Sequence, residues 1–184
     1  MRLFTGLSLA PDALESLTRV SALLQPAAAL RWSPPANLHI TTRFIGAWPA
    51  SRLTELQAAL ANVPLTGPIP VTIAGFGFFP NPHNPHSLFA AVQAAPELHT
   101  LARRIDEAVL ALGGTEEAQP YVPHVTLAHV TPARDAENIT GLQEQITSMT
   151  DTHFGSFNAV DFHLYLSEAG SYTTLATYSL LRAA

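Results

Sequence analysis

Residues 37–45 read NLHITTRFI and residues 122–130 read VPHVTLAHV, and these two stretches decide the fold. They can be laid on one another so that His39 coincides with His124, and two residues later a threonine coincides with a threonine. Both stretches are rich in β-branched and aromatic residues, which favours strands. The two histidines lie 85 residues apart (124 − 39), one in each half of the chain. The sequence therefore predicts two similar halves, each with a strand that carries a His-x-Thr motif.

The spacing within each motif suits chemistry on an anion. Residues two apart on a strand point to the same face, about 6–7 Å apart, so His39 and Thr41 would share a face. His124 and Thr126 would do the same in the second half. Imidazole is the side chain that gains or loses a proton near neutral pH, and two imidazoles form an acid–base couple that can break a P–O bond. The threonine hydroxyls can donate hydrogen bonds to phosphate oxygens.

Two alternatives remain open for these histidines. His-x-Thr is a short pattern, and a third copy begins at His129, so either motif histidine taken alone could be a buried, hydrogen-bonded strand residue. The eight histidines could also suggest a metal site, but the sequence has no cysteine and no HExxH or His-x-x-x-His pattern on a helix. The matched setting of the two copies favours catalysis, and we expect no metal.

The remaining elements follow from periodicity, proline and glycine. The Pro- and Asn-rich segment 80–86, with His83 and His86, is expected to be an exposed loop. Helices are expected at 11–24, 50–62, 96–112 and 135–148, and strands at 2–9, 30–32, 38–46, 69–79, 87–94, 124–130, 154–166 and 172–181.

The composition excludes several classes of chemistry. There is no Cys, which excludes thiol nucleophiles and thiolate metal sites. All nine basic residues are Arg, so a P-loop lysine, a Schiff base and a lysyl-adenylate are excluded as well. A net charge of −5 argues against wrapping a long nucleic acid, but not against binding one terminal phosphate. With no apolar run of about 20 residues, no membrane span is expected.

The chain resembles a known family, the RNA 2′,3′-cyclic phosphodiesterases that were historically named 2′-5′ RNA ligases, within the two-histidine phosphoesterase superfamily. The resemblance covers nearly the whole chain and is most specific in the two His-x-Thr motifs with their flanks. The segments that look like family segments, in family order, are RLFTGLSL, RWSPPANLHITTRFIG, FFPNP, SLFAAV, PYVPHVTLAHV and LYLSEAGSYTTLATYSL.

The resemblance implies an α+β fold with two lobes, each a pseudo-symmetric antiparallel sheet with outer helices, and a central cleft that holds both motifs. Residues 1–184 would form a single two-lobed phosphoesterase domain. His39 is implied as the acid that protonates the leaving 3′-oxygen, and His124 as the base that activates water, so that a 2′-phosphate is produced. Thr41 and Thr126 are implied phosphate binders.

Phe44 and His129 each lie five residues after a motif histidine. Phe44 matches an aromatic residue that could stack on the terminal base, although a core role would suit it equally. His129 stands where the family often has an arginine against the phosphate. By regular strand alternation His129 would point away from His124, and only a bend or bulge near Ala128 would bring it to the phosphate. We expect the phosphate-side placement. The first motif also departs from the family pattern, because it ends in Thr42 where the family usually has an apolar residue. Thr42 should point away from the cleft.

The expected function is hydrolysis of RNA 2′,3′-cyclic phosphate ends, with no cofactor. The substrates would be RNA 3′ ends or cyclic nucleotides. Any 2′-5′ ligation would be the reverse reaction and independent of ATP, because no lysine is available for adenylation. Alternatives are a phosphodiesterase acting on another cyclic phosphate or on 2′-5′-linked oligonucleotides, and a non-catalytic binder of RNA ends. We expect a cytoplasmic monomer that does not bind membranes.

Overall fold

The computed structural model describes residues 1–149 and 152–181, with the side chains at 94 and 132–138 outside the description. The helices are α1 (Pro11–Leu24), α2 (Leu53–Ala61), α3 (Pro96–Ala111) and α4 (Pro132–Ser148). The strands are β1 (Arg2–Leu7), β2 (Arg31–Trp32), β3 (Ile40–Ala47), β4 (Ile69–Phe79), β5 (Ser87–Ala94), β6 (His124–His129), β7 (His153–Ala159), β8 (Asp161–Glu168) and β9 (Ser171–Ser179). Short 3₁₀ turns lie at 25–27, 35–37 and 50–52.

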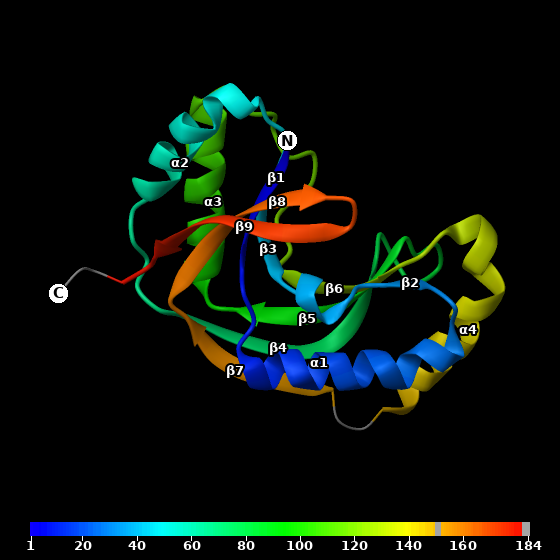
Figure 1. The fold of residues 1–184 in the computed structure, drawn as a ribbon. Coiled ribbons are helices and arrows are strands. Elements are labelled where there is room, and N and C mark those ends of the chain that lie inside the picture. The colour runs from blue at the N-terminus through cyan, green and yellow to red at the C-terminus, as the bar shows by residue number, and fades with distance from the viewer. Residues whose placement is uncertain (150–151, 182–184) are drawn as a thin grey trace.

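The strands form two antiparallel sheets, which confirms the predicted α+β class (Figure 1). The first sheet has the order β3-β1-β8-β9 and the second has the order β2-β6-β5-β4-β7. Each sheet takes strands from both halves of the chain, because β2 from the first half joins the second sheet and β8 and β9 from the second half join the first. The two motifs nevertheless fall one in each sheet, at the start of β3 and of β6.

The helices begin and end close to where the sequence signals place them. α1 begins at Pro11, α3 at Pro96 and α4 at Pro132, each with proline in the first turn, where its missing N–H costs nothing. α3 ends just before Gly113, which takes a positive φ of 80° that glycine adopts without strain. α4 begins three residues earlier than predicted, at Pro132 rather than residue 135.

The end of the chain differs from the sequence prediction. The sequence predicts one long strand over residues 154–166, but the structure has two, β7 and β8, separated at Val160. β7 pairs with β4 in the second sheet, and β8 pairs with β1 in the first. The chain thus changes sheets within one continuous run of strand-forming residues. No glycine or proline lies at Val160 to signal the change, so local propensity does not predict it.

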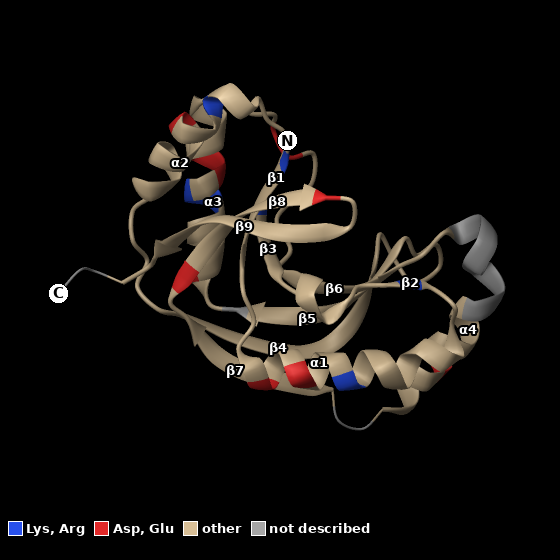
Figure 2. Ribbon diagram, in the orientation of Figure 1, with Lys and Arg blue, Asp and Glu red and all other residues tan. Residues whose placement is uncertain are grey.

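A continuous hydrophobic core joins both sheets and their outer helices. α1 packs along β7, and α3 packs along β3, on the outer side of each sheet (Figure 1). The charged residues lie mostly on the helices, whereas the strands of the second sheet are almost free of them (Figure 2). The outer helices therefore carry most of the charged surface, and the sheets carry the motifs.

Candidate active site

Both motif histidines lie at the start of their strands. His124 is the first residue of β6, and His39 comes one residue before β3, so only the second lies within a strand as predicted. Thr41 and Thr126 follow within β3 and β6, and all four side chains are half-buried. We call the face of each sheet that carries its histidine and threonine the motif face.

A backbone carbonyl fixes the tautomer of each histidine in the same way. Nδ1 of His39 lies 2.7 Å from the carbonyl oxygen of Asn37, and Nδ1 of His124 lies 2.7 Å from that of Val122. A carbonyl oxygen can only accept, so Nδ1 carries the proton in both rings. The lone pair of each neutral ring is then on Nε2. In His39 this atom lies 2.8 Å from Thr41 Oγ1, which joins the two residues of the first motif.

Aromatic side chains hold the His39 ring on the first sheet. The ring centroids of Phe4 and Tyr172 lie 4.7 and 5.3 Å from that of His39. Gly6 leaves the space for the imidazole, because a Cβ at Gly6 would come within 2.7 Å of the Ile40 carbonyl oxygen and 3.2 Å of the His39 ring. The imidazole is therefore held by packing as well as by its hydrogen bonds.

The second sheet repeats this arrangement with different residues. The rings of Phe79 and Phe89 lie 4.8 and 5.4 Å from the His124 ring, and they stack on each other at 4.2 Å. Phe89 lies directly over Gly77, where a Cβ would come within 2.2 Å of the ring. Each motif histidine is thus held against aromatic rings, with a glycine beside the imidazole itself in the first sheet and beneath Phe89 in the second.

The charge of His124 acts on His39. Burial lowers the pKa of His39, and the charge of His124 lowers it further against the effect of the Asn37 carbonyl. Burial also lowers the pKa of His124. Tyr121, just before the second motif, donates a hydrogen bond of 3.1 Å to the carbonyl oxygen of Thr41. The two motifs are therefore neighbours, and both imidazoles are predominantly neutral at pH 7 in the free protein.

A one-residue bulge after Thr41 brings Phe44 back to the motif face. Gly6 of β1 pairs with Thr41 and Thr5 pairs with Arg43, so Thr42 is the extra residue. Thr42 is 2% exposed and shares a 2.7 Å hydroxyl hydrogen bond with Thr5, pointing away from the motif face as expected. Phe44 then pairs with Phe4 and is 57% exposed. This exposure disfavours the core role for Phe44 and leaves base stacking as a prediction.

The second motif has the matching bulge. On β5, Phe89 pairs with Thr126 and Leu88 pairs with Ala128, so Leu127 is the extra residue. Ser87 then pairs with His129, and Ser87 and Phe89 lie on one face because they are two apart on β5. His129 therefore shares the motif face with Thr126, as the phosphate-side placement requires. Its contact with phosphate stays a prediction.

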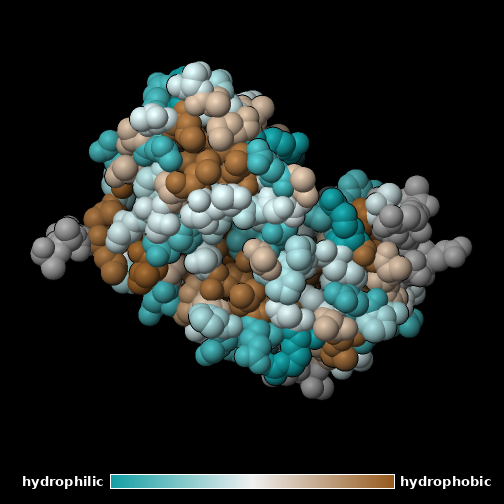
Figure 3. All heavy atoms as spheres, in the orientation of Figure 1, coloured by the Kyte–Doolittle hydropathy of each residue, from teal (hydrophilic) through white to brown (hydrophobic). Residues whose placement is uncertain are grey.

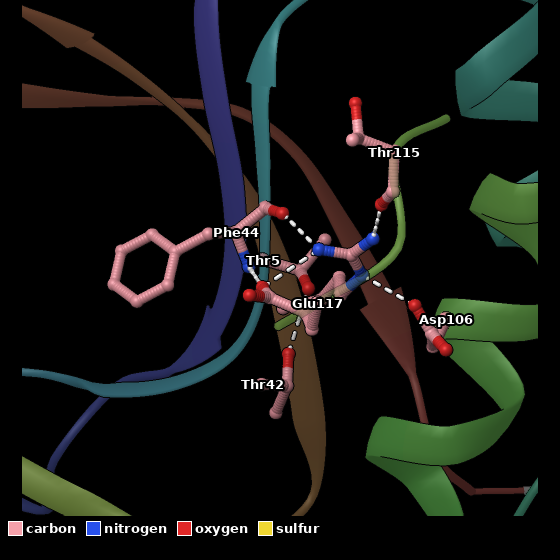
Figure 4. Close-up of polar contacts among 7 residues, drawn as sticks. Thr5, Thr42, Phe44, Asp106, Thr115 and Glu117 are labelled. Carbon is pink, nitrogen blue, oxygen red and sulfur yellow. Dashed lines mark hydrogen bonds and ion pairs between the residues drawn. The ribbon is translucent and has the colours of Figure 1, made fainter. Parts of the chain in front are cut away.

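A buried arginine ties the first motif strand to the segment that leads to the second (Figure 4). Arg43 is 5% exposed, and its Nε and Nη1 atoms donate to Asp106 and Glu117, each at 2.6 Å. The same guanidinium donates to the carbonyl oxygens of Phe44 and Thr115. Figure 4 shows the ring of Phe44 pointing away from this network. The network thus fixes the backbone of Phe44 while leaving its ring free.

A cavity of about 250 Å³ lies beside His39. It is bordered by α1, the turn at 35–37 and the β8–β9 hairpin, and Tyr165 and Tyr172 form one side. Figure 3 shows apolar surface in the hollow between this hairpin and α1. A cavity lined by aromatic side chains can hold a planar part of a ligand, and this cavity would hold it next to the His39 imidazole.

Two features are absent from the part of the chain that the structure describes. No group of three or more His, Asp or Glu side chains among the described residues is arranged to hold a metal ion. No helix within the described ranges is long and apolar enough to cross a membrane.

The sequence prediction missed the residues that surround the motifs. It named Arg43, Phe79, Phe89 and Tyr121 only within longer segments, and it gave no role to Tyr165 or Tyr172. Arg43 is two residues from Thr41, and simple alternation would put it on the motif face. The bulge at Thr42 reverses that, and no residue in the sequence signals the bulge.

Comparison with known proteins identifies the family. A family model described as the 2'-5' RNA ligase superfamily matches residues 8–170. The chain belongs to the 2′-5′ RNA ligase superfamily.

Particular relatives agree with this assignment. A Methanothermobacter thermautotrophicus protein named RNA 2′,3′-cyclic phosphodiesterase is 27% identical over 171 residues, covering 91% of this chain and 90% of the relative. A Geobacillus stearothermophilus protein of the same name is 26% identical over 98% of this chain, which spans only 57% of that relative's length. The crystal structure of TT0787 from Thermus thermophilus superposes with a TM-score of 0.79 at 26% identity, over 98% of both chains.

Proposed function

We propose that this protein hydrolyses 2′,3′-cyclic phosphates at RNA 3′ ends to 2′-phosphomonoesters, without a metal ion or other cofactor. The observation that carries the proposal is the pair of matched His-Thr motifs, in which a carbonyl fixes Nδ1 of each histidine and Nε2 of His39 lies beside the hydroxyl of its own motif threonine. The superfamily membership and the names of the relatives support the substrate class.

Each of the two Nε2 atoms carries out one of the two proton transfers. Neutral His124 accepts a proton from water, and the water oxygen forms a bond to phosphorus. The bond from phosphorus to O3′ breaks, and protonated His39 gives its Nε2 proton to the leaving O3′. Thr41 and Thr126 donate hydrogen bonds to the phosphate oxygens as negative charge develops. The products are a 2′-phosphomonoester and a free 3′-hydroxyl.

The position of the cavity supports this division of roles. Both O2′ and O3′ belong to the terminal nucleoside, so the leaving oxygen is on the nucleoside side of the phosphate. The cavity with Tyr165 and Tyr172 borders His39. We therefore propose that the terminal nucleoside lies on this side, with Phe44 available to stack on its base from the rim.

The lowered pKa values predict an acid optimum for kcat/KM. The free enzyme is active when one histidine is neutral and the other is protonated, so the optimum lies between their two pKa values. Both values are lowered by burial from about 6.5, so we expect the optimum of kcat/KM below pH 6.5. The bound phosphodiester is an anion and raises both pKa values, so the optimum of kcat should lie at higher pH. Rates with a 2′,3′-cyclic nucleotide from about pH 4.5 to 8.5 test this, and a kcat/KM optimum above about pH 7.5 would contradict it.

The threonine hydroxyls should matter less than the imidazoles. Thr41→Val and Thr126→Val keep the side-chain shape and remove one donor to the phosphate, so each should lower kcat/KM by about 10- to 100-fold. Thr42→Val is the matched control, because Thr42 points away from the motif face and bonds to Thr5. That control should keep near-normal activity despite some loss of stability. Equal losses in the three variants would argue against phosphate contacts by Thr41 and Thr126.

Hydrolysis in the presence of EDTA separates catalysis from binding. We expect turnover of 2′,3′-cyclic AMP to be unchanged by EDTA, because the two imidazoles supply both proton transfers. Tight binding of a 2′-phosphorylated end without any turnover would instead favour the non-catalytic binder. The cytoplasmic location, the monomeric state and ATP-independent ligation in the reverse direction stay predictions.

A further inference from the structure

The strands of the second sheet carry one Asp, Glu, Lys or Arg residue, Arg31 of β2, which lies beside the end of the second motif strand β6. Arg31 of β2 pairs directly with His129 of β6. The five strands of this sheet contain no other Asp, Glu, Lys or Arg. Figure 2 shows β2 marked as basic beside strands that carry no charge.

The strand pairing places Arg31 on the motif face. Directly opposed residues on neighbouring strands project to the same face of a sheet. Arg31 opposes His129, and the bulge at Leu127 puts His129 on the face of His124 and Thr126. The next residue, Trp32, opposes the buried Ala128 and packs against the core.

The positions of Thr126, His129 and Arg31 in the sheet place Arg31 at some distance from a phosphate bound between the two motifs. His129 lies two strand steps beyond Thr126, about 7 Å along β6. Arg31 lies one strand further out, about 5 Å across the sheet. The guanidinium of Arg31 would therefore lie further along the sheet than the phosphate held by Thr126. It would lie at a distance that suits the next group of the same ligand.

Arg31 is also free to bind an anion. Its side chain is exposed, and no carboxylate among the described side chains pairs with it. The pKa of His129 is lowered by burial and by the charge of Arg31, so His129 is predominantly neutral at pH 7. The guanidinium is charged at every relevant pH, and its planar fork matches two phosphate oxygens.

We propose that Arg31 binds the phosphodiester on the 5′ side of the terminal nucleotide, next to the cyclic phosphate. This rests on the proposed function and adds a second phosphate subsite to it. A cyclic mononucleotide lacks this phosphodiester, whereas any longer RNA end has it. Arg31 would therefore make the protein prefer an RNA end over a free cyclic nucleotide.

The test compares two substrates in Arg31→Ala. One is 2′,3′-cyclic AMP, and the other is a diadenosine nucleotide with a 2′,3′-cyclic end, which has one internal phosphodiester. We expect KM for the dinucleotide to rise about tenfold or more, as for loss of a charged hydrogen bond, with KM for cyclic AMP within about twofold of wild type. The slope of the logarithm of the dinucleotide affinity against the logarithm of the salt concentration should decrease by about one, which corresponds to the loss of one phosphate contact. Arg31→Lys should restore part of the preference.

The controls isolate the subsite from net charge and from catalysis. Arg103→Ala removes one charge from the outer helix α3, where Arg103 pairs with Glu107, and it should leave both KM values unchanged. A dinucleotide with a neutral methylphosphonate linkage should bind wild type and Arg31→Ala equally. Binding of the 2′-phosphorylated products, 2′-AMP and the dinucleotide, is measured as well, because it does not depend on turnover.

Two results would overturn the subsite. An equal rise in KM for both substrates would place Arg31 on the cyclic phosphate itself, and no change for either would remove it from binding. If wild type binds the dinucleotide product through Arg31 but hydrolyses neither substrate, the proposed function fails and the subsite stands. If wild type hydrolyses both with no preference that depends on Arg31, the subsite fails and the function stands.

Discussion

Replacement of His39 or His124 by alanine should lower the turnover of a 2′,3′-cyclic nucleotide by about two to four orders of magnitude. This is the usual contribution of a general acid or base. The two variants should differ in their pH dependence, because each retains one ionisation. His124→Ala removes the base and should lose the acid limb of the kcat/KM profile, whereas His39→Ala removes the acid and should lose the alkaline limb.

Controls for the histidine variants separate chemistry from folding. His153 lies at the start of the far edge strand β7, so His153→Ala should retain turnover within about twofold of wild type, as expected for a surface substitution away from the site. Melting temperatures of His39→Ala and His124→Ala should stay within a few degrees of wild type, since both side chains are only half-buried. Near-normal turnover in either motif variant would refute the acid–base couple.

The largest effect on stability should come from Arg43. Arg43→Met keeps most of the apolar stem and removes the guanidinium that donates to Asp106, Glu117 and two backbone carbonyls. Loss of one partner in a buried ion pair costs about 3–5 kcal/mol, but both carboxylates here are partly exposed and can regain water. We therefore expect the free energy of unfolding to fall by about 2–4 kcal/mol, which lowers the melting temperature by roughly 4–16 °C.

The matched control for Arg43 is an arginine in an exposed ion pair. Arg103→Met removes a guanidinium that pairs with Glu107 on the surface of α3, and it should change stability by less than about 1 kcal/mol. Arg43→Lys keeps the charge but loses the planar fork, so it should be intermediate. A melting temperature of Arg43→Met within about 2 °C of wild type would show that the network contributes little to the fold.

The helices and most strands could be predicted because their signals are local. Proline at the first turn of α1 and α3, and Gly113 after α3, mark helix ends by their own backbone preferences. The separation of β7 from β8 at Val160 could not be predicted. Both strands have the same local preference there, and only their pairing with β4 and β1 distinguishes them.

The motif residues could be predicted, but their surroundings could not. His39, Thr41, His124 and Thr126 stand out because the same pattern occurs twice in strand-forming segments. The faces of Phe44 and His129 depend on one-residue bulges at Thr42 and Leu127, which arise from the pairing with β1 and β5. Strand alternation alone gives the wrong face at both positions, and the importance of Arg31 follows only from its pairing with His129.

The most direct test of the proposed function is the product formed from an oligoribonucleotide with a 2′,3′-cyclic phosphate end, incubated with the protein and EDTA. The 3′-terminal nucleotide is then identified by chromatography against 2′- and 3′-phosphorylated standards. Because His39 protonates O3′, the phosphate should stay on O2′, and a 2′-phosphorylated end with a free 3′-hydroxyl should be the product. A 3′-phosphorylated product would contradict the assignment of the leaving group, and an intact cyclic end after prolonged incubation would contradict the proposed activity.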